Sequence, residues 1–88
     1  MNDKRPVKPK NLKIIDYQGI YYATFDGEKI WELDRLVSRL IMECDGTKTF
    51  NDIAEKVSRK SGLSIEEVKA GLKPIFDELE KAKFIEWV

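Results

Sequence analysis

The feature that most constrains this chain is a strand that runs directly into a capped helix. Residues 30–34 read Ile-Trp-Glu-Leu-Asp, and Asp34 is placed to accept a hydrogen bond from an unpaired backbone N–H of a following helix. Apolar residues then recur at helical spacing, and Gly46 offers a left-handed stop. The apolar stripe consists of Leu36, Val37, Leu40, Ile41 and Cys44. The sequence therefore places strands ahead of helices.

Two β-rich segments precede this strand. Residues 12–17 and 20–25 are separated by Gln18-Gly19, and Asp26-Gly27 is typical of a two-residue type I′ hairpin turn. A two-residue turn predicts that Tyr22 lies opposite Trp31 and Ile20 opposite Leu33. These four side chains would share the core-facing side of the sheet, which gives Trp31 a structural role.

Two further helix starts follow. Thr49 is expected to cap a helix that ends at Ser61-Gly62, and Ser64 with Glu67 fits a capping box for a third helix. Gly71 and Pro74 predict a kink or a split near residues 70–74 of that helix. The last segment, residues 84–88, reads as extended chain or a short strand.

The order of elements predicts a single α+β domain. A three-stranded antiparallel sheet followed by three helices gives a winged-helix-like domain over residues 11–88, preceded by a flexible basic tail over residues 1–10. Residues 1–13 sum to a charge of +4 and the remainder to −4, because the remainder holds 11 basic and 15 acidic residues. The folded part is therefore mildly acidic.

Composition argues against catalysis. The chain has no histidine and one cysteine, so it lacks the commonest general base and any cysteine-based metal cluster. Cys44 ends an apolar stripe, where a packed side chain is expected in place of a reactive thiol. We expect a non-enzymatic protein with no cofactor and no bound metal. No apolar run is long enough to cross a membrane, and a cytoplasmic location is expected.

A winged-helix DNA-binding regulator is the alternative that the pattern leaves open. The second and third predicted helices have helix-turn-helix proportions. Glu66 and Glu67, however, lie at the end that would meet phosphates, and residues 48–83 carry eight basic and seven acidic side chains. Nucleic-acid binding is therefore not expected. A docking domain for an enzyme subunit is a third possibility.

The order of motifs resembles the PqqD-like family, small proteins also called RiPP recognition elements. Three groups of residues carry the resemblance: Glu32-Leu33-Asp34, Cys44-Asp45-Gly46-Thr47-Lys48-Thr49 with Ile53-Ala54, and Glu67-Val68 through Leu72 to Leu79. It covers roughly residues 12–86. The resemblance implies a peptide-binding chaperone that captures the leader of a ribosomally made precursor peptide. It also implies presentation of that peptide to a modifying enzyme, often of the radical S-adenosylmethionine type.

The same resemblance implies the site. The leader would add as a strand to the third strand and lie against the third helix, which is peptide binding by β-augmentation. The residues carried over are Lys29, Ile30, Trp31, Glu32, Leu33, Val68, Lys69, Leu72, Lys73 and Phe76. The two helix lysines would suit an acidic or amphipathic leader. No membrane partner is expected.

Overall fold

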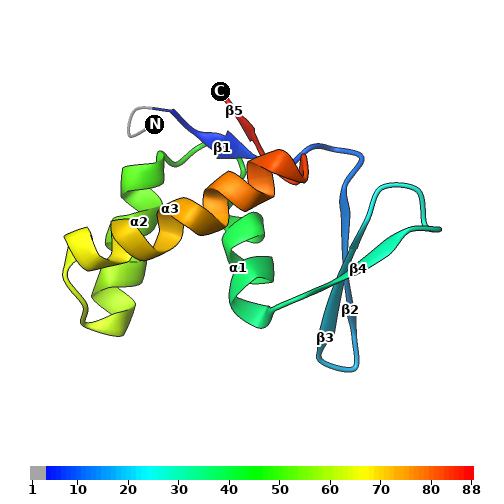
Figure 1. Ribbon diagram of the computed structural model, residues 1–88, viewed down its shortest axis with the longest axis horizontal. Helices are drawn as coiled ribbons and strands as arrows, with labels where there is room; N and C mark the ends of the chain where they lie inside the picture. Colours follow the sequence, from blue (N-terminus) through cyan, green and yellow to red (C-terminus); the bar gives the residue numbers. More distant parts are fainter. Residues whose placement is uncertain (1–3) are drawn as a thin grey trace.

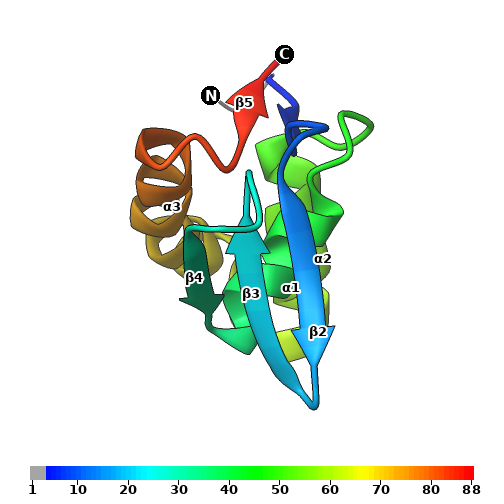
Figure 2. The ribbon, with the colours of Figure 1, turned by 90° about the vertical axis from the view of Figure 1, so that its right-hand side faces the viewer.

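The computed structural model describes residues 4–88 and has the predicted α+β organisation (Figure 1). A three-stranded antiparallel sheet is followed by three helices, and a small two-stranded sheet joins the ends of the chain. The elements are β1 (Pro6–Val7), β2 (Lys13–Tyr17), β3 (Ile20–Thr24), β4 (Ile30–Leu33), α1 (Arg35–Glu43), α2 (Phe50–Ser61), α3 (Ile65–Lys81) and β5 (Glu86–Trp87). The helices cover one face of the three-stranded sheet, and the other face is open to solvent (Figure 2).

The register of β3 and β4 differs by one residue from the predicted register. Ala23 lies opposite Trp31, and Tyr21 lies opposite Leu33, so the expected pairing of Tyr22 with Trp31 is wrong. A shift of one residue exchanges the two faces of a strand. Ala23, which is fully buried, therefore replaces Tyr22 on the helix-facing side of the sheet. Ile20 lies on the solvent-facing side and is 43% exposed.

The loop between β3 and β4 explains this shift. Asp26-Gly27 does not form a two-residue turn, because the loop spans residues 25–29. The Asp26 carboxylate accepts the N–H groups of Glu28 and Lys29 at 2.8 and 3.0 Å, and these bonds hold the pKa of Asp26 below its usual value. The Thr24 hydroxyl accepts the Gly27 N–H and donates to the Lys29 carbonyl. The side chains of Thr24 and Asp26 thus stabilise a connection that is longer than the predicted two-residue turn.

All three predicted helix caps are present. Asp34 accepts the N–H of Leu36 at 2.7 Å, and Thr49 exchanges both bonds of a capping box with Asp52. Ser64 accepts the Glu67 N–H as predicted. The expected return bond differs, since the Glu67 carboxylate accepts the Ser64 hydroxyl and not the cap's backbone N–H. Gly62 ends α2 in the left-handed conformation, with φ of 77°.

α3 is one helix of 17 residues, so of the predicted kink or split near residues 70–74 the split is wrong. Pro74 lies on the exposed side of the helix. The carbonyl of Ala70, which loses its usual partner, is on an exposed residue and can bind water. A proline at such a position removes a helical bond without leaving a buried polar group. Val68, Leu72, Phe76 and Leu79 form the continuous buried face.

The ends of the chain pair with each other. β1 pairs with β5 in antiparallel fashion, and Arg5 and Val88 exchange two backbone hydrogen bonds of 2.8 Å. Lys8 N–H also donates to the Cys44 carbonyl, and an isolated bridge links Val7 to Asp45. The expectation of a flexible tail is therefore wrong for residues 4–8. Residues 1–3 of the expected tail lie outside the described residues. The predicted extended segment at the C-terminus is confirmed as β5.

Candidate functional site

β4 is a terminal strand of its sheet, as the β-augmentation hypothesis requires. The strand order is β2-β3-β4, and within residues 4–88 no further strand pairs with β4. The hairpin of β2 and β3 closes on Tyr17 and Ile20 around a two-residue turn, and hydrogen-bonded pairs alternate along antiparallel strands. By this alternation Trp31 bonds inward to β3. Ile30 and Glu32 direct their N–H and C=O groups toward the open edge.

An aromatic cluster lies beside this edge. The Trp31 ring meets Phe84 and Phe25 edge to face, with centroid distances of 5.5 and 6.2 Å. Phe84 also lies 5.8 Å from Phe25 and is 5% exposed. Trp31 remains 42% exposed. The indole is therefore part of the packing, as predicted, and also presents apolar surface beside the open backbone groups.

The two faces of β4 offer different side chains. Ile30 lies on the solvent-facing side of the sheet and is 55% exposed, whereas Leu33 faces the helices and is half-buried. Lys29 and Glu32 are exposed. A peptide strand added here would meet one apolar side chain on each face, Ile30 on one and Trp31 on the other.

Three of the five helix residues predicted for the site belong to the core. Val68, Leu72 and Phe76 are at most 5% exposed. The Phe76 ring lies 5.2 Å from Phe50 and 5.9 Å from Trp87, so it packs between α2 and β5. These side chains shape α3, but they are not available to contact a peptide.

The two predicted lysines lie on the side of α3 that faces β5. Lys73 precedes Glu80 by seven residues, which places both on one side of the helix. Glu80 lines a hollow together with Trp87 of β5. Lys69 precedes the buried Phe76 by the same interval and is half-buried. The structure therefore does not bring these lysines to the β4 edge.

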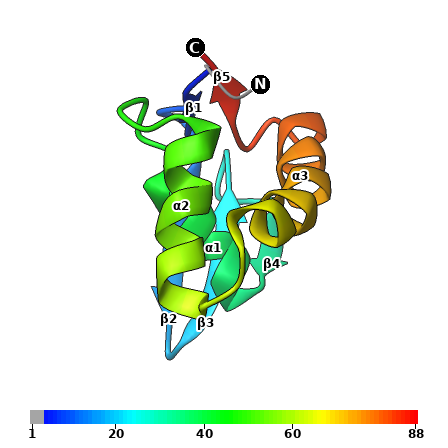
Figure 3. The same ribbon diagram turned by 90° about the vertical axis from the view of Figure 1, so that its left-hand side faces the viewer.

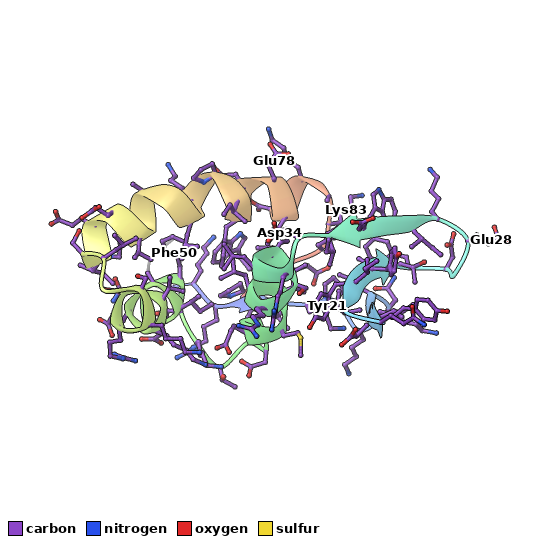
Figure 4. All side chains as sticks on the ribbon, turned by 90° about the horizontal axis from the view of Figure 1, so that it is seen from below. Tyr21, Glu28, Asp34, Phe50, Glu78 and Lys83 are labelled. Carbon is purple, nitrogen blue, oxygen red and sulfur yellow. The ribbon has the colours of Figure 1, made fainter. Side chains whose placement is uncertain are left out.

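The opposite side of α3 carries residues that the sequence did not single out for the site. Gly71, Ile75 and Glu78 follow one another at helical spacing on the side away from β5. α3 and β4 are neighbours in two views of the molecule (Figures 2 and 3). Glu78 projects away from α2 (Figure 4). The available signal was the helical spacing of Gly71 and Ile75, but Gly71 was interpreted together with Pro74 as an interruption of the helix.

Cys44 is an inert core side chain, as predicted. It is 2% exposed, and its thiol donates to the Leu40 carbonyl at 3.1 Å. Burial, with a smaller effect of the Asp45 and Glu43 carboxylates, raises the pKa of the Cys44 thiol to about 12. A thiol held protonated in this way is a poor nucleophile and a poor metal ligand at neutral pH.

No protein-family model, curated protein or solved structure matches this chain. Across residues 4–88, no helix is long and apolar enough to cross a membrane. In the same part of the chain, no group of three or more carboxylate and thiol side chains is arranged to hold a metal ion. The candidate site therefore depends on the geometry of β4 and its aromatic neighbours.

Proposed function

We propose that this protein binds an extended peptide by adding it as a strand to the open edge of β4. The observation that carries the proposal is the edge itself. Ile30 and Glu32 present unpaired backbone groups there, and the half-exposed Trp31 lies between them. Strand addition uses backbone bonds for affinity and alternating side chains for selectivity.

The energetics indicate what kind of peptide would bind. Each backbone hydrogen bond contributes about 1 kcal/mol net, and two residues on β4 supply up to four such groups. Micromolar affinity needs about 8 kcal/mol. The remainder must come from apolar burial over Ile30 and Trp31, at about 25 cal/mol per Å². The peptide should therefore carry apolar residues on both faces of its strand.

The resemblance to PqqD-like proteins suggests the biological peptide. We propose the leader of a ribosomally made precursor, which this protein presents to a modifying enzyme, a radical S-adenosylmethionine enzyme being the first candidate. The helix residues Lys69 and Lys73 are not brought to the β4 edge, so we do not propose selectivity for an acidic leader there. A cytoplasmic location belongs to the same proposal.

The test is a ¹⁵N-HSQC titration of the full chain with a synthetic leader from a short peptide encoded beside the gene. We expect shifts concentrated in residues 28–33 and near Phe84. Ile30→Pro should abolish these shifts, because proline removes an outward N–H that the fold does not use. The matched variant Ile30→Val keeps the N–H and should bind normally.

Three outcomes contradict the proposal. One is unchanged binding by Ile30→Pro. Another is a set of shifts confined to other elements. The third is tight binding of a short DNA duplex with a steep salt dependence, which would favour the DNA-binding alternative.

A further inference from the structure

The second edge of the sheet carries a hollow that the proposed function does not use. A depression of ≈ 840 Å³ lies between β2 and α1, with residues 14–16 on one wall and Arg39 and Met42 on the other. β2 and β4 are the two terminal strands of the sheet, on opposite sides of β3 (Figure 2). The hollow is therefore separated from the proposed peptide edge by the width of the sheet.

The charges around this hollow are strongly one-sided. Lys8, Lys10, Lys13 and Arg39 all line it, and Asp16 is the one acidic residue among the lining residues. Asp16 is engaged locally, because its carboxylate accepts the Gly19 N–H at 3.1 Å. The salt bridges formed within residues 4–88 include none of the four cations. Within these described residues their charge is thus unpaired, in a chain whose overall charge is zero.

One of the cations is held in place by the fold. The Lys8 ammonium donates to the Leu12 carbonyl at 2.6 Å and to the Pro9 carbonyl at 3.2 Å. The Lys8 backbone N–H donates to the Cys44 carbonyl at 2.7 Å. An ammonium has three N–H donors, so one remains for an acceptor outside the chain. Because Lys8 is already ordered, binding an anion there costs little side-chain entropy.

The backbone and apolar surface of the hollow suit an extended segment. Hydrogen-bonded pairs alternate along β2 and β3, so Ile14 and Asp16 direct their N–H and C=O groups away from β3. Ile15 is 42% exposed and Met42 is 64% exposed. The side chains of a strand paired with β2 alternate between the two faces of the sheet, so they would meet Met42 and Arg39 on the α1 side and Ile15 and Lys13 on the other.

We propose that this hollow docks an acidic, extended segment of a partner protein, which pairs with β2 and places carboxylates against Lys8, Lys10, Lys13 and Arg39. The chain would then hold two different strands on the two edges of one sheet. This gives an adaptor a separate surface for its partner while β4 holds a peptide. The docking site depends on Lys8, Lys10, Lys13 and Arg39, so its test is independent of the β4 proposal.

The first test uses the full ¹⁵N-labelled chain and a capped peptide, Glu-Val-Glu-Leu-Glu-Val-Glu-Thr. We expect amide shifts in residues 8–16 and near Arg39, and weaker binding at higher salt. A peptide in which lysine replaces each glutamate should not bind. N-methylation of alternate peptide bonds should also abolish binding, because the paired backbone donors are lost.

Charge reversal provides the matched variants. Arg39→Glu removes an attraction and adds a repulsion, so it should weaken binding about fivefold to tenfold. Arg59→Glu makes the same change on an exposed residue of α2 outside the hollow and should leave affinity unchanged. Ile30→Pro should also leave this binding unchanged, which separates the two edges.

Several results overturn the docking proposal. Equal binding of the lysine peptide would show that the cations do not select the partner. Shifts confined to β4, or full binding by the N-methylated peptide, would contradict the proposed pairing with β2. Displacement of the acidic peptide by a short DNA duplex, with Arg39→Glu weakening the duplex more than the peptide, would assign the hollow to nucleic acid.

Discussion

The rings of Trp31 and Phe84 meet edge to face with their centroids 5.5 Å apart, and this contact joins the edge strand β4 to the segment that follows α3. Phe84 is buried, whereas Trp31 is half-exposed, so the two residues have different roles in the same contact. Phe84 anchors the C-terminal segment and supports the indole. The supported indole of Trp31 lies partly at the surface, beside the outward-directed backbone groups of β4.

The first prediction concerns this anchor. Phe84→Ala should lower the free energy of unfolding by about 3 kcal/mol or more, because it removes a buried ring that packs against Phe25 and Trp31. Urea denaturation followed by circular dichroism measures the change. Leu63→Ala is the control, since Leu63 is 51% exposed, and its cost should stay below about 1 kcal/mol. Similar losses in the two variants would contradict the assigned packing.

A second prediction tests the register of β4. Proline at two successive positions should have different effects, because Trp31 bonds inward and Ile30 outward. We expect Trp31→Pro to cost at least about 1–3 kcal/mol more than Trp31→Ala, the penalty for a ladder partner left without its bond. Ile30→Pro and Ile30→Ala should differ little in stability. Thermal and urea unfolding of the four variants decide between this register and one shifted by a residue.

Two glycines should respond in opposite ways to alanine. Gly71 lies inside α3 with open space where a Cβ would be placed, so Gly71→Ala should stabilise the fold by about 0.5–1 kcal/mol. Gly62 has φ of 77°, and Gly62→Ala should destabilise it by about 1 kcal/mol. Differential scanning calorimetry would show the opposite shifts in Tm. A destabilised Gly71→Ala would mean that α3 is not a regular helix at that residue.

The pKa of Cys44 predicts how stability depends on pH. In the folded protein the thiol stays protonated up to about pH 12. In the unfolded chain it ionises near its ordinary value of about 8.5. The unfolded chain therefore binds fewer protons above that pH, and its free energy falls relative to the folded state. The Cys44 contribution is fully present below about pH 8.5 and is progressively lost as pH rises toward 12.

The measurement compares urea unfolding at about pH 7 and about pH 9.5. We expect a loss of about 1 kcal/mol at the higher pH, since one pH unit corresponds to about 1.4 kcal/mol. Cys44→Ala lacks the titrating group, and most of the loss should disappear in that variant. Rapid alkylation of Cys44 in the native protein would contradict its burial.

Local chemistry made the helices and the overall order of elements predictable. Asp34, Thr49 and Ser64 are caps whose partners lie two or three residues away, so their role is visible in a short window. The turn residues that separate the strands are likewise visible in a short window of sequence. The order of three strands and three helices follows from these signals alone.

Features that depend on distant residues were not predictable. The pairing of Pro6 with Trp87 joins the two ends of the sequence, and no local pattern identifies it. The β3–β4 register depends on how Thr24 and Asp26 bond within their own loop. The direction in which the Lys73 side chain points depends on which side of α3 packs toward β5. The strand half of the candidate site was thus accessible from sequence, whereas the helix half was not.

The pairing of β1 with β5 also bears on the topology of the chain. Because Arg5 and Val88 are hydrogen-bonded neighbours, a short linker could close the polypeptide into a ring without disturbing either sheet. New ends could then be opened at the exposed Gln18-Gly19 turn, leaving the outer edges of β2 and β4 unblocked. The domain is therefore suited to circular permutation, in which new ends are introduced at a chosen loop.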